Sequence, residues 1–275
     1  MDTKLSIWSQ YYYELKIEDA VERFIRNGIY ASELSDEHGF ELLNRSDDVV
    51  STGKSLKNFI DERNFEISQG HLWLKVKICS GDIENIYNWI DMYEAIGIKN
   101  MVLHCDNLVD TSFSKQEKID KNIEKLTLIA DYIRDKDITI CLENLRLHFP
   151  EQKYIIDQNA DDLLYIIDRV GSPRFGICLD TGHLNLTEKD HYKFILKAGK
   201  KLKALHIADN EGFSDQHMMP FTKGNVDFQE VVRGLREVDY KGLFNLEIPG
   251  ESRIPIELRD AKIQYIKACY EYLMR

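Results

Sequence analysis

Four side chains that can bind a metal ion or move a proton stand where four successive apolar segments end. Glu143 closes TICLE, Asp180 closes GICLD, His206 lies in ALHIAD and Glu247 closes FNLE. Their separations of 37, 26 and 41 residues each match about one strand and one helix. Three carboxylates that meet at one point repel one another unless a positive charge lies among them. A divalent cation, held by carboxylate oxygens and an imidazole, supplies that charge.

A mixed oxygen and nitrogen ligand set suits Mn, Co, Zn, Fe or Mg and does not choose among them. For any single one of the four residues, the alternative is a buried polar group satisfied by backbone atoms or by a lysine. Because all four residues occur in this order, about one strand apart, a metal site is favoured over this alternative. We therefore predict one divalent ion bound by Glu143, Asp180, His206 and Glu247.

The segments that must position these residues alternate regularly along the chain. Eight short runs rich in apolar and β-branched residues are predicted as strands, at 4–9, 28–35, 72–79, 100–105, 137–144, 175–180, 202–209 and 243–248. Helical spacing separates them, and a last helix is predicted over about 256–273. No linker rich in proline, glycine or serine interrupts the alternation, which is typical of parallel strands joined by right-handed crossovers.

This alternation predicts an α/β fold, a (β/α)8 TIM barrel that forms a single domain over residues 1–275. A doubly wound open sheet is the alternative, although no GxGxxG motif follows the first strand. In a barrel the carboxyl-terminal ends of the strands build the active site, so the four residues would share one rim.

Bulk composition excludes several classes of function. The 275 residues include 36 Lys and Arg against 47 Asp and Glu, a net charge of −11, which makes nucleic acid an unlikely partner. No run approaches 18 apolar residues, and the start MDTKLSIWSQ has no signal-peptide pattern, so we expect a cytoplasmic protein without a membrane partner. The five cysteines form no CxxC pair and are expected to be reduced. A homodimer is the expectation from base rates.

These motifs resemble those of the sugar phosphate isomerase/epimerase superfamily, which includes xylose isomerase, ketose 3-epimerases and the endonuclease IV nucleases. The matching pieces are CLEN (141–144), GICLDTGHLNL (176–186), ALHIADN (204–210), DQH (215–217) and FNLEIPG (244–250). The resemblance implies a xylose isomerase-like TIM barrel in which the four residues above bind one divalent metal.

The sugar-processing members imply an isomerase or epimerase that acts through an enediolate on a small sugar, sugar phosphate or inosose-type substrate. The metal would chelate a carbonyl and a neighbouring hydroxyl, while Glu143 and Glu247 would remove and return a proton. His104, His183 and His217 would position substrate hydroxyls. A plain loop histidine is the alternative for His183.

Two further residues are candidates for substrate contact. Lys77 would meet an anionic group, with packing or a salt bridge as the alternative. Trp8, at the end of the first strand, would stack on a sugar ring, with loop packing as the alternative. Glu33, near the end of the second strand, would face the pocket, and a surface or ion-pair role is the favoured alternative.

The nuclease members imply a different site, with three zinc ions that activate water. Much of their ligand set has a counterpart in His104, Glu143, Asp180, His183, His206, Asp215, His217 and Glu247. A histidine at the end of the third strand is missing, because the predicted strand there reads LKVKICSG and His71 precedes it, at the opposite end. A zinc-dependent AP endonuclease is therefore the alternative function. A barrel that binds sugar without turnover is a second alternative, although it has no need of two glutamates beside a substrate.

Overall fold

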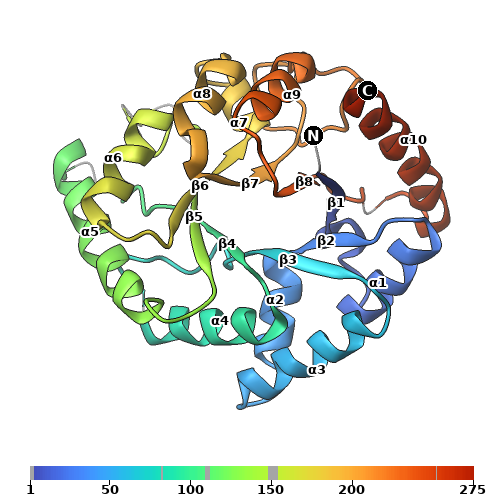
Figure 1. The fold of residues 1–275 in the computed structure, drawn as a ribbon, viewed down its shortest axis with the longest axis horizontal. Coiled ribbons are helices and arrows are strands. Elements are labelled where there is room, and N and C mark those ends of the chain that lie inside the picture. The colour runs from blue at the N-terminus through green and yellow to red at the C-terminus, as the bar shows by residue number, and fades with distance from the viewer. Residues whose placement is uncertain (1–2, 82, 109–111, 148–153, 252) are drawn as a thin grey trace.

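Eight parallel strands form the inner wall of the molecule, and helices surround them (Figure 1). The computed structural model describes residues 3–81, 83–108, 112–147, 154–251 and 253–275. The strands are β1 (Lys4–Trp8), β2 (Ala31–Leu34), β3 (Glu66–His71), β4 (Asn100–Leu103), β5 (Thr139–Glu143), β6 (Phe175–Asp180), β7 (Leu202–His206) and β8 (Leu243–Leu246). Each pairs with its neighbours along the chain, and β1 also pairs with β8. A parallel bridge between Ile207 and Leu246 links the remaining edges, so the expected TIM barrel is confirmed.

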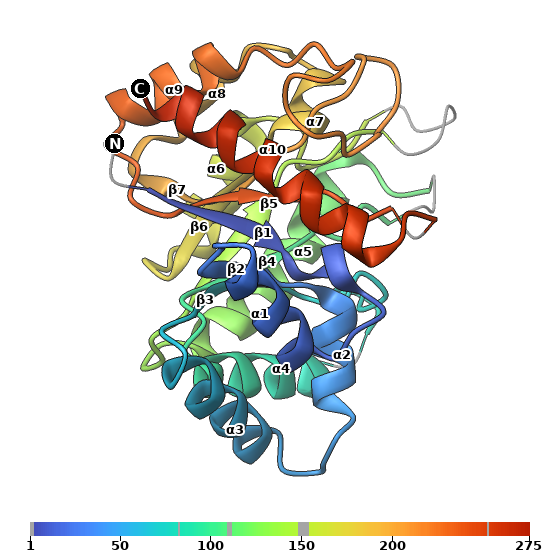
Figure 2. The same cartoon turned by 90° about the vertical axis from the view of Figure 1, so that its right-hand side faces the viewer.

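The helices lie on the outside of this ring, as the side view also shows (Figure 2). They are α1 (Ile17–Arg26), α2 (Asp36–Leu43), α3 (Val49–Asp61), α4 (Ile83–Ile96), α5 (Lys115–Tyr132), α6 (Ala160–Val170), α7 (Thr181–Asn185), α8 (His191–Ala198), α9 (Phe228–Glu237) and α10 (Ile256–Met274), with 3-10 turns at Ser9–Tyr12 and Gly199–Lys201. Side-chain caps begin several of them. Ser114 and Glu117 form a capping box at α5, and the Asp227 carboxylate accepts two backbone N–H groups at α9. Among the described residues, none of the helices has the length and apolar character needed to span a bilayer.

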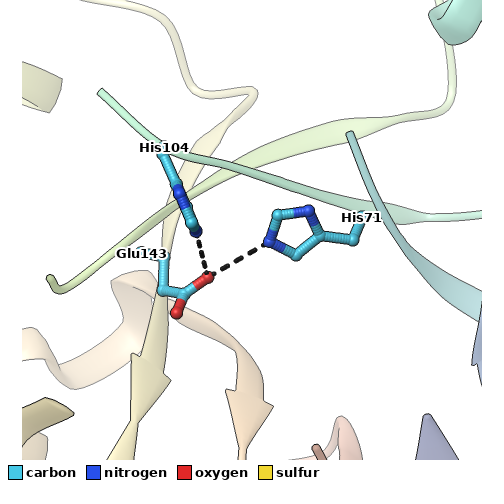
Figure 3. Close-up of side chains that lie close together, drawn as sticks. All are labelled: His71, His104 and Glu143. Carbon is cyan, nitrogen blue, oxygen red and sulfur yellow. Dashed lines mark hydrogen bonds and ion pairs between the residues drawn. The ribbon is translucent and has the colours of Figure 1, made fainter. Parts of the chain in front are cut away.

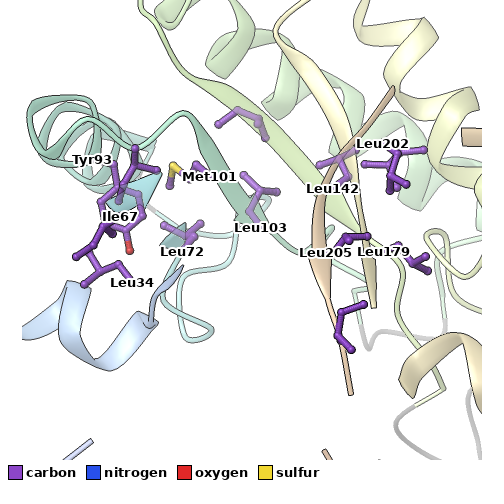
Figure 4. Close-up of a cluster of buried hydrophobic side chains, with 14 of the residues drawn as sticks. Leu34, Ile67, Leu72, Tyr93, Met101, Leu103, Leu142, Leu179, Leu202 and Leu205 are labelled. Atoms are coloured by element: carbon purple, nitrogen blue, oxygen red, sulfur yellow. The ribbon is translucent and has the colours of Figure 1, made fainter. Parts of the chain in front are cut away.

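Alternate residues along the strands belong to two separate cores. Leu103, Leu142, Leu179 and Leu205 pack in the large core between strands and helices, part of which Figure 4 draws. Their neighbours one position earlier, which are Val102, Cys141, Cys178 and Ala204, form a small cluster of their own. Because strand side chains alternate between faces, this second cluster lies inside the barrel. Two positions further along the same four strands, the inward-facing residues are therefore His104, Glu143, Asp180 and His206.

The third strand was predicted wrongly. The structure places β3 at Glu66–His71, whereas residues 72–79 form the loop that leads to α4. The alternation in LWLKVKIC is typical of a strand. It arises here in a loop, because Leu72 and Ile78 pack into the large hydrophobic core while Lys75 and Lys77 face solvent. The true strand was passed over because Gln69 and His71, both buried, bring polar side chains to the barrel.

Candidate metal centre

Four inward-facing residues form a compact central group at the carboxyl ends of the strands. Ligand-type atoms of Glu143, Asp180, His206 and Glu247 all lie within 4.8 Å of one another. His206 Nδ1 lies 3.2 Å from Glu143 Oε2 and 3.4 Å from Glu247 Oε2. All four side chains are buried. The structure thus brings together the residues for which one divalent ion was predicted.

A second group shares Glu143 with the first (Figure 3). His71 Nε2 lies 3.3 Å, and His104 Nε2 3.0 Å, from Glu143 Oε2. The sequence-based expectation that His71 lies at the opposite end of the barrel is wrong, because His71 is the last residue of β3 rather than a residue before it. The histidine that was thought to be missing is therefore present at the rim.

A third group lies beside the central one. Asp215, in the loop between β7 and α9, lies 3.1 Å from His183 Nε2 and 3.2 Å from His217 Nε2. His183 lies in α7, directly after β6, and its backbone N–H donates to Asp180 Oδ1. Asp180 therefore serves both as the N-cap of α7 and as a member of the central group. The guanidinium of Arg146 lies 3.2 Å from Asp215 Oδ2.

The histidines of these groups are oriented by hydrogen bonds on their far side. The Nδ1 atoms of His71, His183 and His217 face the backbone carbonyls of Leu72, Asn144 and Glu247 at 2.6, 3.0 and 2.9 Å. A carbonyl oxygen only accepts, so each of these nitrogens carries the hydrogen. A neutral ring then turns the lone pair of its other nitrogen toward a carboxylate. Two acceptors at about 3 Å repel one another unless a proton or a cation lies between them.

Several ligand-type atoms in the centre make no hydrogen bond although they are buried. These atoms are Asp180 Oδ2, His206 Nδ1, Asp215 Oδ1 and Glu247 Oε2. Buried polar atoms without partners are rare in folded proteins because leaving them unpaired is costly. Inward-facing lone pairs, converging carboxylates and unpartnered atoms together fit a bound cation. The residues present therefore suit the metal that the sequence suggested.

The pKa values of the two glutamates of the central group are shifted in opposite directions in the metal-free protein. Burial raises the pKa of Glu247 to about 8, although His206 and His217 oppose the shift. Burial acts in the same direction on Glu143, but the imidazoles around it, His206 and His104 first, outweigh burial and hold the pKa of that carboxyl well below its usual range. One carboxyl group thus favours the protonated form and the other the ionised form at neutral pH.

A pocket of about 430 Å³ opens over the centre. Its polar side consists of His71, His104, Glu143, His183, Asp215, Gln216, His217 and Glu247, and its apolar side of Trp8, Leu74, Leu145 and Pro249. The structure therefore places Trp8 at the pocket, as the sequence suggested. Lys77 lies in the loop after β3, exposed, and lines a smaller neighbouring cavity with His71 and His104. It makes no hydrogen bond with the three groups.

A surface or ion-pair role was favoured for Glu33. The surface position is wrong, because Glu33 is completely buried, while its carboxylate does pair with an imidazole, at 3.0 Å from His206 Nε2. Its position in the strand ASEL, between Ser32 and Leu34, gave little signal of its role. All four residues of this strand are buried, so an alternation of faces does not single out Glu33.

Replacing His71 with alanine is expected to lower the number of divalent ions bound per chain while leaving the central group occupied. His71 lies beside Glu143 and His206 but is not one of the four central residues, so Glu143, Asp180, His206 and Glu247 all remain. Metal content by mass spectrometry would measure this. His38→Ala is a matched control, because His38 is also buried but is hydrogen-bonded to Ser9 and Leu15 outside the three groups. An unchanged metal count in His71→Ala would contradict the expectation.

The fold and the site together define a TIM barrel with a histidine and carboxylate centre suited to divalent metal. A family model described as xylose isomerase-like TIM barrel matches residues 19–269. The chain belongs to this family. It is 27% identical over 197 residues to an uncharacterized protein of Sinorhizobium fredii, a match over 70% of this chain and 57% of that protein. An uncharacterized protein of Methanocaldococcus jannaschii is 31% identical over 134 residues, or 48% of this chain and 44% of that protein. The chain thus spans about half the length of these curated relatives.

Solved structures of sugar epimerases have the same fold. A D-psicose 3-epimerase from Clostridium cellulolyticum, solved with D-tagatose, superposes with a TM-score of 0.80 at 15% identity and covers 99% of this chain and 100% of its own. The 3-keto-D-glucoside 4-epimerase of E. coli, in its apo form, gives a TM-score of 0.79 at 16% identity over 98% of this chain and 100% of its own. Likeness at this identity establishes the shared fold alone.

Proposed function

We propose that the protein is a metal-dependent isomerase or epimerase of a small sugar, with Glu143 and Glu247 as its proton-transfer pair. The observation that carries this proposal is the shared position of the two glutamates. Both line the pocket, and both approach the same nitrogen of His206 within 3.4 Å. Similarity of fold to solved ketose epimerases adds support.

A divalent cation held by Glu143, Asp180, His206 and Glu247 would acidify a C–H group next to a carbonyl and stabilise the negative charge that follows. The protein's own residues would then handle the proton. One glutamate, as carboxylate, accepts the proton from one face of the substrate carbon, and the other, as carboxylic acid, returns a proton.

The remaining pocket residues would bind and orient the substrate. His104, His183 and His217 offer imidazole groups to hydroxyls, while Trp8, Leu145 and Pro249 provide an apolar wall for the carbon face of a sugar. Lys77 would contribute only to a substrate whose anionic group reaches the neighbouring cavity.

Deuterium incorporation from solvent tests the proposal. The metal-loaded protein, incubated in D2O with a panel of free and phosphorylated ketoses, should introduce deuterium next to the carbonyl of at least one of them, as NMR would detect. Protein that binds metal yet exchanges no substrate hydrogen in a broad panel would contradict the proposal.

Phosphoester hydrolysis by more than one metal ion is a second candidate, and the position of His71 favours it. With His71 at the rim, the three groups contain nine side chains: His71, His104, Glu143, Asp180, His183, His206, Asp215, His217 and Glu247. Clusters of metal ions bridged by carboxylates are suited to phosphoester cleavage. Two or three zinc ions per chain, together with cleavage of bis(4-nitrophenyl) phosphate or abasic-site DNA, would favour this candidate over the first.

Trp8→Ala is expected to raise KM for the sugar about fivefold with little change in kcat. The loss of one stacking contact costs about 1 kcal/mol, and the indole N–H of Trp8 makes no hydrogen bond that would tie it to the central group. Steady-state kinetics would measure the effect, and Trp8→Phe should largely restore KM. Equal losses in kcat for both variants would show that Trp8 does more than bind the ring.

A further inference from the structure

Below the central group, a line of buried polar side chains crosses the barrel from β1 to β7. Ser6 Oγ donates to Asn245 Oδ1 at 2.7 Å, and Asn245 Nδ2 donates to Glu33 Oε2. Glu33 Oε1 in turn lies 3.0 Å from His206 Nε2. Ser6, Glu33, Asn245 and His206 are all fully buried. The line therefore ends on the imidazole of the central group and has no outlet to solvent.

The direction of these hydrogen bonds fixes the state of His206. The carboxylate of Glu33 only accepts, so the nitrogen facing it, Nε2, carries the hydrogen. With that hydrogen on Nε2, Nδ1 is the nitrogen that faces Glu143 and Glu247, at 3.2 and 3.4 Å. No lysine or arginine of the described residues forms an ion pair or hydrogen bond with Glu33. A buried carboxylate without a cationic neighbour is costly, so its charge is best explained by a positive charge beyond the imidazole.

We propose that Glu33 is a positioning residue of the metal centre, which fixes His206 as an Nδ1 ligand and increases its affinity for a divalent cation through its negative charge. This inference rests on the metal site of the proposed function. His206 differs in this respect from His71, His183 and His217, whose Nδ1 atoms each face a backbone carbonyl, although the Nδ1 atom of His183 also lies 3.2 Å from Glu143 Oε1. A carboxylate on the far nitrogen of a metal-bound histidine makes the ring a stronger ligand.

Two variants separate the charge of Glu33 from its hydrogen bonds. In Glu33→Gln, the new side-chain carbonyl still accepts from His206, but the new N–H group meets the N–H group of Asn245. Adding Asn245→Asp repairs this conflict, because the new carboxylate accepts from position 33 and from Ser6. The double variant thus keeps every hydrogen bond and the total charge, yet moves the negative charge one residue away from His206.

The dissociation constant for Co²⁺ and the melting temperature of the metal-free protein are the two readouts. We expect Co²⁺ binding to weaken by about 10–100-fold in both variants, whereas the double variant recovers the melting temperature that the single variant loses. Ser6→Ala, three hydrogen bonds from His206, should lower the melting temperature and leave Co²⁺ binding within about twofold of the wild type.

Co²⁺ binding that returns together with the melting temperature in the double variant would overturn the inference, because Glu33 would then act through its hydrogen bonds alone. Unchanged Co²⁺ binding in Glu33→Gln would overturn it as well, while the metal site of the proposed function would stand. Wild-type protein that binds no Co²⁺ would contradict both this inference and the metal site of the proposed function.

Discussion

Glu247→Gln is expected to reduce kcat/KM for substrate proton exchange by about 1,000-fold or more. The substitution removes a group that can take up and release a proton, which alone contributes about 100- to 10,000-fold in acid–base catalysis. It also replaces a charged oxygen of the central group, where Glu247 Oε2 is buried, makes no hydrogen bond and lies 3.4 Å from His206 Nδ1. The measurement is the rate of deuterium incorporation, with metal content determined on the same sample.

The paired metal determination separates the two roles of Glu247. A variant that retains metal but loses exchange has lost a proton-transfer group, and one that loses both has lost a ligand. Glu251→Gln is the matched control, because Glu251 follows the same strand but is exposed and pairs with Lys262. Full activity in Glu247→Gln would contradict the assignment of this residue to catalysis.

Removal of metal with a chelator is expected to abolish exchange and to lower the free energy of unfolding. A ligand present at about 100 times its dissociation constant stabilises the folded state by about 2.7 kcal/mol, so this is the expected loss at that loading. Thermal unfolding with and without chelator would measure it, and added Mn²⁺, Co²⁺ or Zn²⁺ should restore both stability and activity. Full activity after exhaustive chelation would contradict a role for metal.

Metal binding and the stability of the metal-free protein should respond to pH in opposite directions. Burial alone would lower the pKa of His71, but the adjacent Glu143 outweighs it and raises the pKa to about 9. Burial is likewise outweighed at His217, where Glu247 and Asp215 raise the pKa to about 10. Both imidazoles are therefore protonated at pH 7 in the metal-free protein, and a cation held by the adjacent Glu143 and Glu247 would favour the loss of those protons.

The affinity for metal should therefore rise between pH 7 and about 9, by about tenfold per pH unit for each proton displaced. The stability of the metal-free protein should change in the opposite direction and fall as the pH rises. A raised histidine pKa contributes stability that is complete below the unfolded value of about 6.5 and is lost as the pH rises through the folded value. Co²⁺ titrations and chemical denaturation of the metal-free protein at pH 6.5, 7.5 and 8.5 would check both trends. Metal affinity independent of pH would contradict this account.

Most of the barrel could be predicted from the sequence because most strands carry apolar residues on both faces. Phe175–Asp180 was predicted with its observed bounds, and six other strands lie within the predicted segments. β3 could not be found this way, since Gln69 and His71 put polar side chains on its inner face. A hydrophobic pattern indicates contact with the core but not membership of a sheet. Residues 72–79 contact the core through Leu72 and Ile78 although they form no strand.

The central group of the site could be predicted because each member closes an apolar segment. His71 could not, because its position relative to the rim depends on the register of a strand that was placed six residues too late. Glu33 could not either, since a glutamate is usually exposed and only the positions of His206 and Asn245 in space explain its burial. Residues that support a ligand from another strand leave no local pattern in the chain.

The anchoring of His71, His183 and His217 to backbone carbonyls has a consequence for redesign of the centre. A backbone carbonyl remains when any side chain is substituted, so the orientation of these three imidazoles depends on the backbone of the barrel. His206 takes its orientation instead from a side chain that can be exchanged, Glu33. Three histidines are thus fixed in orientation by the backbone, and the orientation of His206 can be changed by substitution. Metal preference could be tuned by substitution at position 33 without rebuilding the remainder of the pocket.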